Sequence, residues 1–145
     1  MKLRRSISRN EQGVATVEMA FALPVLIVMI WMFVQLAQVY RAMAGIQQAL
    51  GEGARYATLC LNPGPTGCTT PSAAQVKQRI TDTVYGIGPG TFTVSDPGTG
   101  TAAVDGSNYY DLTVRYQQPT SLLLFPGPDI DVSRSKRVWI AGAAS

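Results

Sequence analysis

The apolar residues of this chain gather in one long run from Met19 to Val34, which Gln35 interrupts. With its flanks, from Val14 to Ala37, the run would form a helix about 36 Å long at about 1.5 Å per residue. The hydrocarbon core of a membrane is only about 30 Å thick. The pattern therefore predicts one transmembrane helix.

Helical periodicity continues beyond this run. Apolar side chains recur every three or four positions at Val39, Met43, Ile46 and Leu50. We expect one continuous helix over about 14–50, or as far as Leu59, with Gly51 and Gly53 weakening its end. A second series, of small residues, repeats every four positions at Gly45, Ala49, Gly53 and Ala57. Such a stripe lets another backbone approach closely, and its partner is either the protein's own sheet or a neighbouring helix.

The pattern changes after residue 70. Ser72 can cap free amides and Gln75 can reach back to it, which predicts the start of a short helix that ends at Gly86. Its apolar face is formed by Val76, Ile80 and Val84. Alternating apolar and polar residues then predict strands at 91–95, 109–116 and 129–140, with turns at 96–101 and 105–108. The apolar segment Ser121–Phe125 either caps the core or contacts a partner.

These elements predict an α+β fold. A long N-terminal transmembrane helix continues into a small domain with a short helix and an antiparallel sheet of about three strands, one face of which is buried. About 108 of the 145 residues lie beyond the span, enough for one small domain.

The segment before the span is strongly basic. Residues 1–13 hold four basic residues against Glu11, a net charge of +3 that equals the net charge of the whole chain. Basic residues beside a span stay in the cytoplasm, so we expect the N-terminus inside and the chain after about residue 38 outside. Topology explains this cluster better than nucleic-acid binding does, and no nucleic-acid partner is expected. A cleaved secretory signal is not expected either, because its apolar region is usually about 7–15 residues long.

Glu18 is the residue of the apolar segment that calls for an explanation. An acidic side chain costs about 2.5–3.5 kcal/mol at the membrane centre and less near its edge. One interpretation places Glu18 in the headgroup layer, where its carboxylate reaches water. The other makes Gly13 a cleavage point. Glu18 then becomes an assembly residue that pairs with the new amine of Val14 on a neighbouring subunit.

The spacing of Gly13 and Glu18, between a basic leader and an apolar span, resembles the type IV prepilin signature of the Flp/Tad branch. With the Leu23-Pro24 step and a motif at the helix end, it looks like the TadE-like family of minor pilins, or pseudopilins. That family motif comprises Glu52, Gly53, Ala54, Arg55, Tyr56 and Ala57. The resemblance covers about residues 12–59 and the rest only in outline. Met19 departs from it, because Flp-type signals usually have an aromatic residue there.

The resemblance implies a single-pass protein of the bacterial inner membrane, with a periplasmic pilin-like domain, that remains in the membrane or joins the pilus at the cell surface. Prepilin peptidase would cut between Gly13 and Val14. Its other partners would be pilins and Tad inner-membrane assembly proteins, and its role pilus assembly or adhesion. The expected regions are a leader at 1–13, the extended helix at 14–59 and the domain at 60–145. The alternative is a membrane-anchored periplasmic binding or recruitment module outside any filament.

Pro24 lies within the predicted span. Proline lacks an N–H and clashes with the carbonyl four residues earlier, here that of Ala20, so a kink or local melting is expected. It is either neutral in a single-pass anchor or a hinge that lets the helix pack into a filament.

The two cysteines, Cys60 and Cys68, flank a segment with two prolines and two glycines, which predicts a loop. Both should lie outside the cytoplasm, where a structural disulfide is favoured. A redox pair usually has two intervening residues, and a metal site would need more ligands than this chain offers.

No catalytic constellation is expected. The chain contains no histidine, so a Ser-His-Asp or Cys-His arrangement cannot form. Asp129 and Asp131 would share one side of a strand, but solvated carboxylates are the common case at a strand edge. We expect no enzyme activity, no metal site and no cofactor.

Overall fold

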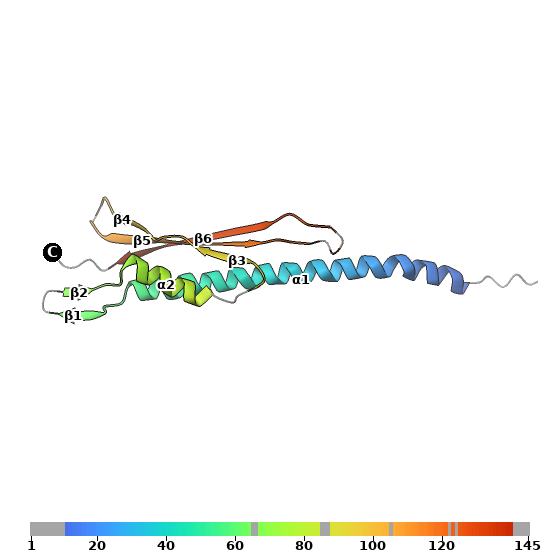
Figure 1. Ribbon diagram of the computed structural model, residues 1–145, viewed down its shortest axis with the longest axis horizontal. Coiled ribbons are helices and arrows are strands. Elements are labelled where there is room, and N and C mark those ends of the chain that lie inside the picture. The colour runs from blue at the N-terminus through green and yellow to red at the C-terminus, as the bar shows by residue number, and fades with distance from the viewer. Residues whose placement is uncertain are drawn as a thin grey trace, which may run out of the picture.

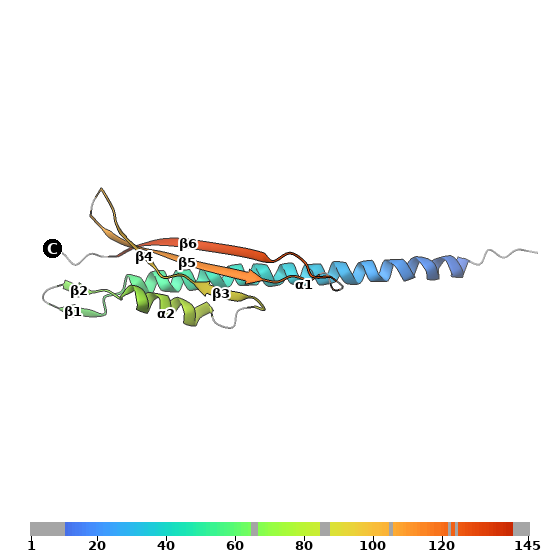
Figure 2. The same ribbon diagram turned by 45° about the horizontal axis from the view of Figure 1, so that its top comes forward.

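The computed structural model describes residues 11–64, 67–84, 88–104, 106–121, 123 and 125–140. A short helix and a sheet lie along one half of a long helix, whose other half extends beyond them (Figures 1 and 2). The elements are α1 (Glu11–Ala57), β1 (Asn62–Gly64), β2 (Gly67–Thr69), α2 (Ala73–Val84), β3 (Thr91–Val94), β4 (Gly98–Thr101), β5 (Asn108–Gln118) and β6 (Ile130–Ile140). The predicted α+β class, with its long N-terminal helix, short helix and antiparallel sheet, is confirmed.

The long helix is continuous over its 47 residues. It is already helical at Glu11, before the predicted start at Val14, and it passes through Pro24 without a break. The backbone is therefore not melted at Pro24, and the kink there stays a prediction. The helix ends at Ala57, where the carbonyl of Arg55 accepts hydrogen bonds from the Thr58 amide (3.2 Å) and hydroxyl (2.8 Å). Gly51 and Gly53 do not interrupt it.

The main sheet is built around β5. One edge of β5 pairs with β6 along its full length, from Asn108 opposite Ile140 to Gln118 opposite Ile130. The other edge pairs with β4 near its start and with β3 near its end, and all pairs are antiparallel. The sheet thus has four strands but is three strands wide.

Two predictions of local structure were wrong. The segment Gly98–Thr101, expected as a turn, is strand β4, and the segment between the cysteines, expected as a loop, contains the antiparallel pair β1–β2. Strand β4 has no apolar side chain that would signal a strand. Its Gly100 leaves room for the ring of Tyr109 on β5, because a Cβ there would lie 2.9 Å from the Tyr109 Cε1.

The core lies between α1, α2 and the sheet. The helix α1 contributes Ala42, Ile46, Ala49 and Leu50, α2 contributes Val76, Ile80 and Val84, and β5 contributes Leu112, Val114 and Tyr116. The capping pair at the start of α2 forms as predicted, since Gln75 Oε1 accepts from the Ser72 amide at 2.9 Å. The predicted end of α2 at Gly86 lies outside the described residues.

The small-residue stripe of α1 has a partner within this chain. Its members Gly45, Ala49, Gly53 and Ala57 are all buried. At Gly53 a Cβ would lie 2.7 Å from Cδ1 of Ile80 and closer still to its Cγ1. Because Ile80 belongs to α2, the glycine is what lets the two helices approach. Of the two partners expected for the stripe, a sheet or a neighbouring helix, the structure shows a helix at this point, the short helix α2 of the same chain.

Candidate functional site

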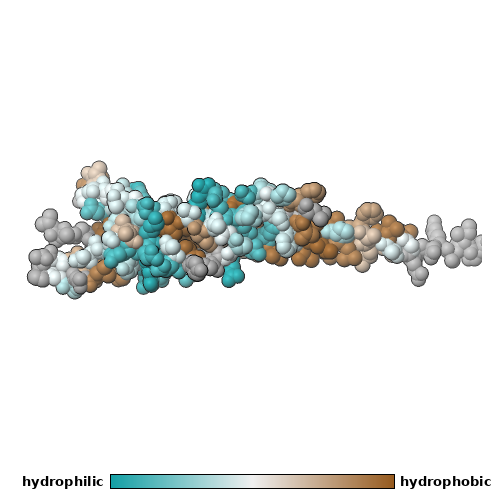
Figure 3. Space-filling model, viewed as in Figure 1, coloured by the Kyte–Doolittle hydropathy of each residue, from teal (hydrophilic) through white to brown (hydrophobic). Residues whose placement is uncertain are grey.

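The free half of α1 is an extended apolar surface that nothing covers in the described part of the chain. Between Gly13 and Ala57 the helix is long and apolar enough to cross a membrane, and its most apolar stretch is not buried at all. Phe21 is 75% exposed and Val25 69%. A core helix of a globular protein would be covered, so this surface fits a single-pass membrane anchor. In Figure 3 it forms the mostly brown surface on the right.

The predicted processing and assembly residues lie near the start of this half. Gly13 is in the first turns of α1 with open space around it, and Val14 is 70% exposed. Glu18 is also exposed. Because Val14 and Glu18 are four residues apart in a helix, they share one face. The basic residues of the expected leader lie outside the described residues.

Coverage of α1 begins at Gln35, which is only 9% exposed. Its side-chain amide pairs with the backbone of Ser121: Nε2 donates to the Ser121 carbonyl, and Oε1 accepts from the Ser121 amide at 3.3 Å. The indole Nε1 of Trp31, one turn earlier, donates to the same carbonyl at 2.9 Å. In the sequence, Gln35 is recognisable only as an interruption of the apolar run. This interruption could have indicated a contact with the domain. A buried side-chain amide needs hydrogen-bond partners, and lipid offers none.

A second contact, between Gln38 of α1 and Gln118 of β5, holds the end of β5 on α1. Gln118 is 3% exposed, and its Nε2 donates to Gln38 Oε1 at 3.3 Å. The Tyr116 hydroxyl donates to Gln118 Oε1 at 2.6 Å and accepts from the Gly90 amide at 3.1 Å. Two glutamines of α1, Gln35 and Gln38, therefore hold the end of β5 and the chain that follows it.

The motif at residues 52–57 has a packing role in this structure. Gly53 admits Ile80, as described above, and Ala57 is fully buried. Glu52 lies 4.0 Å from the Arg79 guanidinium, also on α2. Tyr56 packs against the core, whereas Arg55 is exposed. The motif thus joins the end of α1 to α2.

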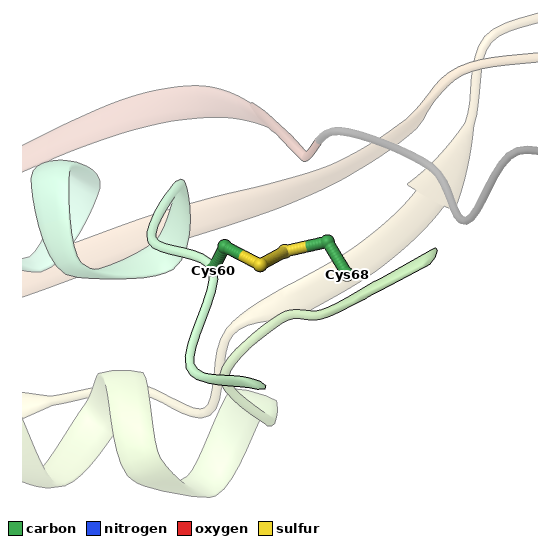
Figure 4. The surroundings of a disulfide bond; sticks show 2 residues. All are labelled: Cys60 and Cys68. Atoms are coloured by element: carbon green, nitrogen blue, oxygen red, sulfur yellow. A yellow bond between two sulfur atoms is a disulfide. The ribbon is translucent and has the colours of Figure 1, made fainter. Parts of the chain in front are cut away.

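Cys60 and Cys68 form a disulfide, with their Cα atoms 5.3 Å apart (Figure 4). In the β1–β2 ladder, Cys68 is opposite Pro63. The bridge therefore closes the segment between the end of α1 and the start of α2, and it leaves no free cysteine. The disulfide expected from the sequence is present.

Two ion pairs cross from β5 to β6 on the exposed face of the sheet. Asp111 accepts from the Arg137 guanidinium at 2.8 Å, and those hydrogen bonds hold the pKa of its carboxyl below the ordinary 3.8. The hydrogen bonds from Arg115 lower the pKa of Asp131 in the same way. Arg137 also lies over the ring of Tyr109, 4.1 Å from its centroid. Asp131 is thus engaged with arginine rather than paired with Asp129 as a cation site.

Among the residues that the structure describes, no group of three or more histidine, cysteine, aspartate or glutamate side chains comes together. What this molecule presents is an apolar helix surface with the carboxylate of Glu18 near its start.

The family model described as TadE-like protein matches residues 13–55. The matched segment begins at Gly13 and covers the free half of α1, the glutamines that hold β5, and most of the motif that joins α2. No curated protein and no solved structure matches the chain.

Proposed function

We propose that this chain, a TadE-like protein by the match of its residues 13–55, is a minor pilin or pseudopilin of a Tad/Flp-type pilus. It is anchored by a single span with the N-terminus in the cytoplasm and the domain in the periplasm. Prepilin peptidase removes residues 1–13, and the mature subunit then acts in pilus assembly or adhesion. Its partners are other pilins and Tad inner-membrane proteins, and it carries out no catalysis.

The observation that carries this proposal is the division of α1 into a covered and a free half. A helix of 47 residues has only its second part packed in the domain, while the first part exposes apolar side chains on every side. Lipid can cover such a surface in the membrane, and the helices of other subunits can cover it in a filament. A subunit that moves between the two needs this kind of surface.

The position of Glu18 supports the same proposal. After cleavage at Gly13, the amine of Val14 and the carboxylate of Glu18 would lie on one helical face, one turn apart. Opposite charges in an apolar setting are stabilised when they pair, and two subunits in register can pair the amine of one with the carboxylate of the other. A purely anchoring helix has no need for this arrangement.

Intact-mass measurement of the protein extracted from membranes tests the proposal. We expect a mass reduced by residues 1–13, and a further shift on reduction that reports the Cys60–Cys68 bond. The variant Gly13→Val should accumulate uncut, because the peptidase must admit the backbone at this position and valine adds a branched side chain. A wild-type chain that keeps residues 1–13 would instead favour the membrane-anchored binding module.

Cleavage at this site also requires the start of α1 to open. Gly13 is helical here, and a peptidase binds an extended backbone. Helix ends open at little cost compared with helix interiors. A glycine close to the end lowers the cost further, because it is a poor helix former.

A further inference from the structure

The connection between β5 and β6, residues 119–129, is called the hairpin tip below; the structure describes all of it except residues 122 and 124. It reaches along α1 towards the free half of the helix in both views (Figures 1 and 2). It contains the apolar segment Ser121–Phe125, for which the sequence left open a role in the core or with a partner. Leu123 is 49% exposed and Phe125 68%, so these two side chains do not cap the core.

Leu123 adopts a left-handed backbone conformation, with φ at 69°. That conformation costs a residue with a Cβ about 1–2 kcal/mol, and glycine or asparagine is the usual choice. A half-exposed leucine gains little from packing that would offset this cost in water. In an apolar surrounding, the same side chain would be favoured.

The hairpin tip lies at the level where the helix should leave the membrane. If the hydrocarbon core begins near Val17, about 20 residues bring the helix to its outer boundary near Leu36. Ser121 is hydrogen-bonded to Gln35 and Trp31. It therefore lies at that boundary or just inside it. Tryptophan is itself typical of membrane interfaces.

The lack of charged residues and the hydrogen bonding of the backbone suit a position of the hairpin tip at the membrane boundary. No charged residue occurs over 117–128, and none occurs over 19–40 of the helix. The Gly127 amide donates to the Thr120 carbonyl at 2.8 Å, and the Thr120 hydroxyl donates to the Pro128 carbonyl at 2.6 Å. Prolines at 119, 126 and 128 have no N–H to satisfy. At these positions the backbone is hydrogen-bonded or, at the prolines, has no N–H, which lowers the cost of placing it near the bilayer.

An apolar groove of about 330 Å³ lies between the hairpin and α1. Met29, Met32 and Phe33 line it on the helix side, and Pro128 and Ile130 line it on the hairpin side. It opens on the surface that the anchor presents to its surroundings. In Figure 3 the brown surface of the free helix continues to the end of the sheet domain at this place.

We infer that the hairpin tip is a second membrane contact, with Leu123 and Phe125 among the acyl chains of the outer leaflet and one acyl chain in the groove. The inference rests on the membrane anchor in the proposed function. A neighbouring subunit is another class of partner for an apolar tip. Depth favours lipid, because the helix at this level is itself surrounded by lipid before any assembly.

Photocrosslinking of the full chain in vesicles tests the inference. p-Benzoylphenylalanine replaces Phe125 in the test variant, Phe21 in the span as the positive control, and Val104 as the matched exposed control. Val104 is 99% exposed and lies between β4 and β5, at the other end of β5. The vesicles contain palmitoyl-oleoyl phosphatidylethanolamine and palmitoyl-oleoyl phosphatidylglycerol, with no other protein.

We expect a lipid adduct at position 125 in a yield close to that at position 21 and several-fold above that at position 104. Fragmentation should place it on an acyl chain rather than on a headgroup. An adduct at 21 without one at 125 overturns the inference and leaves the anchor intact. Protein–protein adducts alone at 125 overturn it in favour of a neighbouring subunit. No adduct at 21 contradicts the anchor itself, and the inference with it.

Discussion

Glu18 is the residue on which assembly should depend most. Its carboxylate lies one turn from Val14, and its loss makes the span more apolar. Glu18→Ala should therefore insert at least as well as the wild type and be cleaved nearly normally, while pilus number and co-purification with other pilins fall. Quantitative pull-down measures co-purification with other pilins, and electron microscopy measures pilus number.

The matched control is Thr16→Ala, which replaces a polar residue of α1 two positions before Glu18 and removes no charge. Normal pilus number and normal co-purification in Glu18→Ala cells would rule out the assembly role. Glu18 would then be a headgroup-layer residue.

Gln35 holds the hairpin tip on the helix through two hydrogen bonds to Ser121. Gln35→Leu preserves the size of the side chain and removes both bonds. Local opening of the tip should become easier by about 1–3 kcal/mol, because each of the two hydrogen bonds contributes about 0.5–1.5 kcal/mol net. Hydrogen exchange of the peptide that covers 119–129, in lipid nanodiscs, should become several-fold faster.

Gln47→Leu provides the control for that change, because Gln47 is an exposed glutamine of the same helix. It should leave exchange at 119–129 unaltered. Equal exchange in Gln35→Leu and wild type would mean that the tip is held by other contacts.

At the scale of elements, the approach of α1 and α2 depends on Gly53. Gly53→Ala places a methyl group against Ile80, which is fully buried, so the side chain or a helix must shift to admit it. Overpacking of this kind costs about 1–3 kcal/mol. The midpoint of thermal unfolding, followed by circular dichroism in detergent, should fall by about 5 °C or more.

Gly51, two residues earlier, has nothing within 4 Å of the position of a Cβ. Gly51→Ala should therefore be neutral or stabilise the helix by up to about 1 kcal/mol, because alanine is the better helix former. If both substitutions had the same effect, close packing at Gly53 would not be the reason for its glycine.

Periodicity sufficed to predict the elements whose own residues form the core. The apolar faces of α2 and β5 are visible in the sequence, and Val76, Ile80, Leu112 and Val114 are buried as their spacing indicated. Strand β4 was missed because it has no apolar side chain of its own, and what identifies it is its backbone pairing with β5. The contact of Gln35 was missed because its partner is a backbone 86 residues away. Both features depend on residues outside the segment concerned, so the pattern within the segment did not identify them.

At the scale of the whole molecule, acidity should loosen the sheet domain. The pKa values of Asp111 and Asp131 are lower in the folded state than the ordinary 3.8, because arginines donate hydrogen bonds to their carboxylates. Their contribution to stability is therefore complete above the unfolded-state pKa and is lost as pH falls through the lower folded-state pKa. The unfolding midpoint should be steady between about pH 7 and pH 5 and fall below about pH 4.

The double variant Asp111→Asn, Asp131→Asn cannot lose these charges on acidification. It should have a lower midpoint at neutral pH and a smaller decline in acid, measured by thermal unfolding across the same pH series. A decline as steep as that of the wild type would assign the acid sensitivity to other carboxylates.

The boundary at Gln35 also determines what is conserved when the subunit changes its surroundings. Every described hydrophobic residue of the core lies at Val39 or later. Exchange of lipid for neighbouring helices around residues 13–34 therefore alters no interior contact of the domain. Under the proposed function, transfer from membrane to filament would change the surroundings of the free half of α1 and of the hairpin tip, while the hydrophobic core of the domain stays as it is.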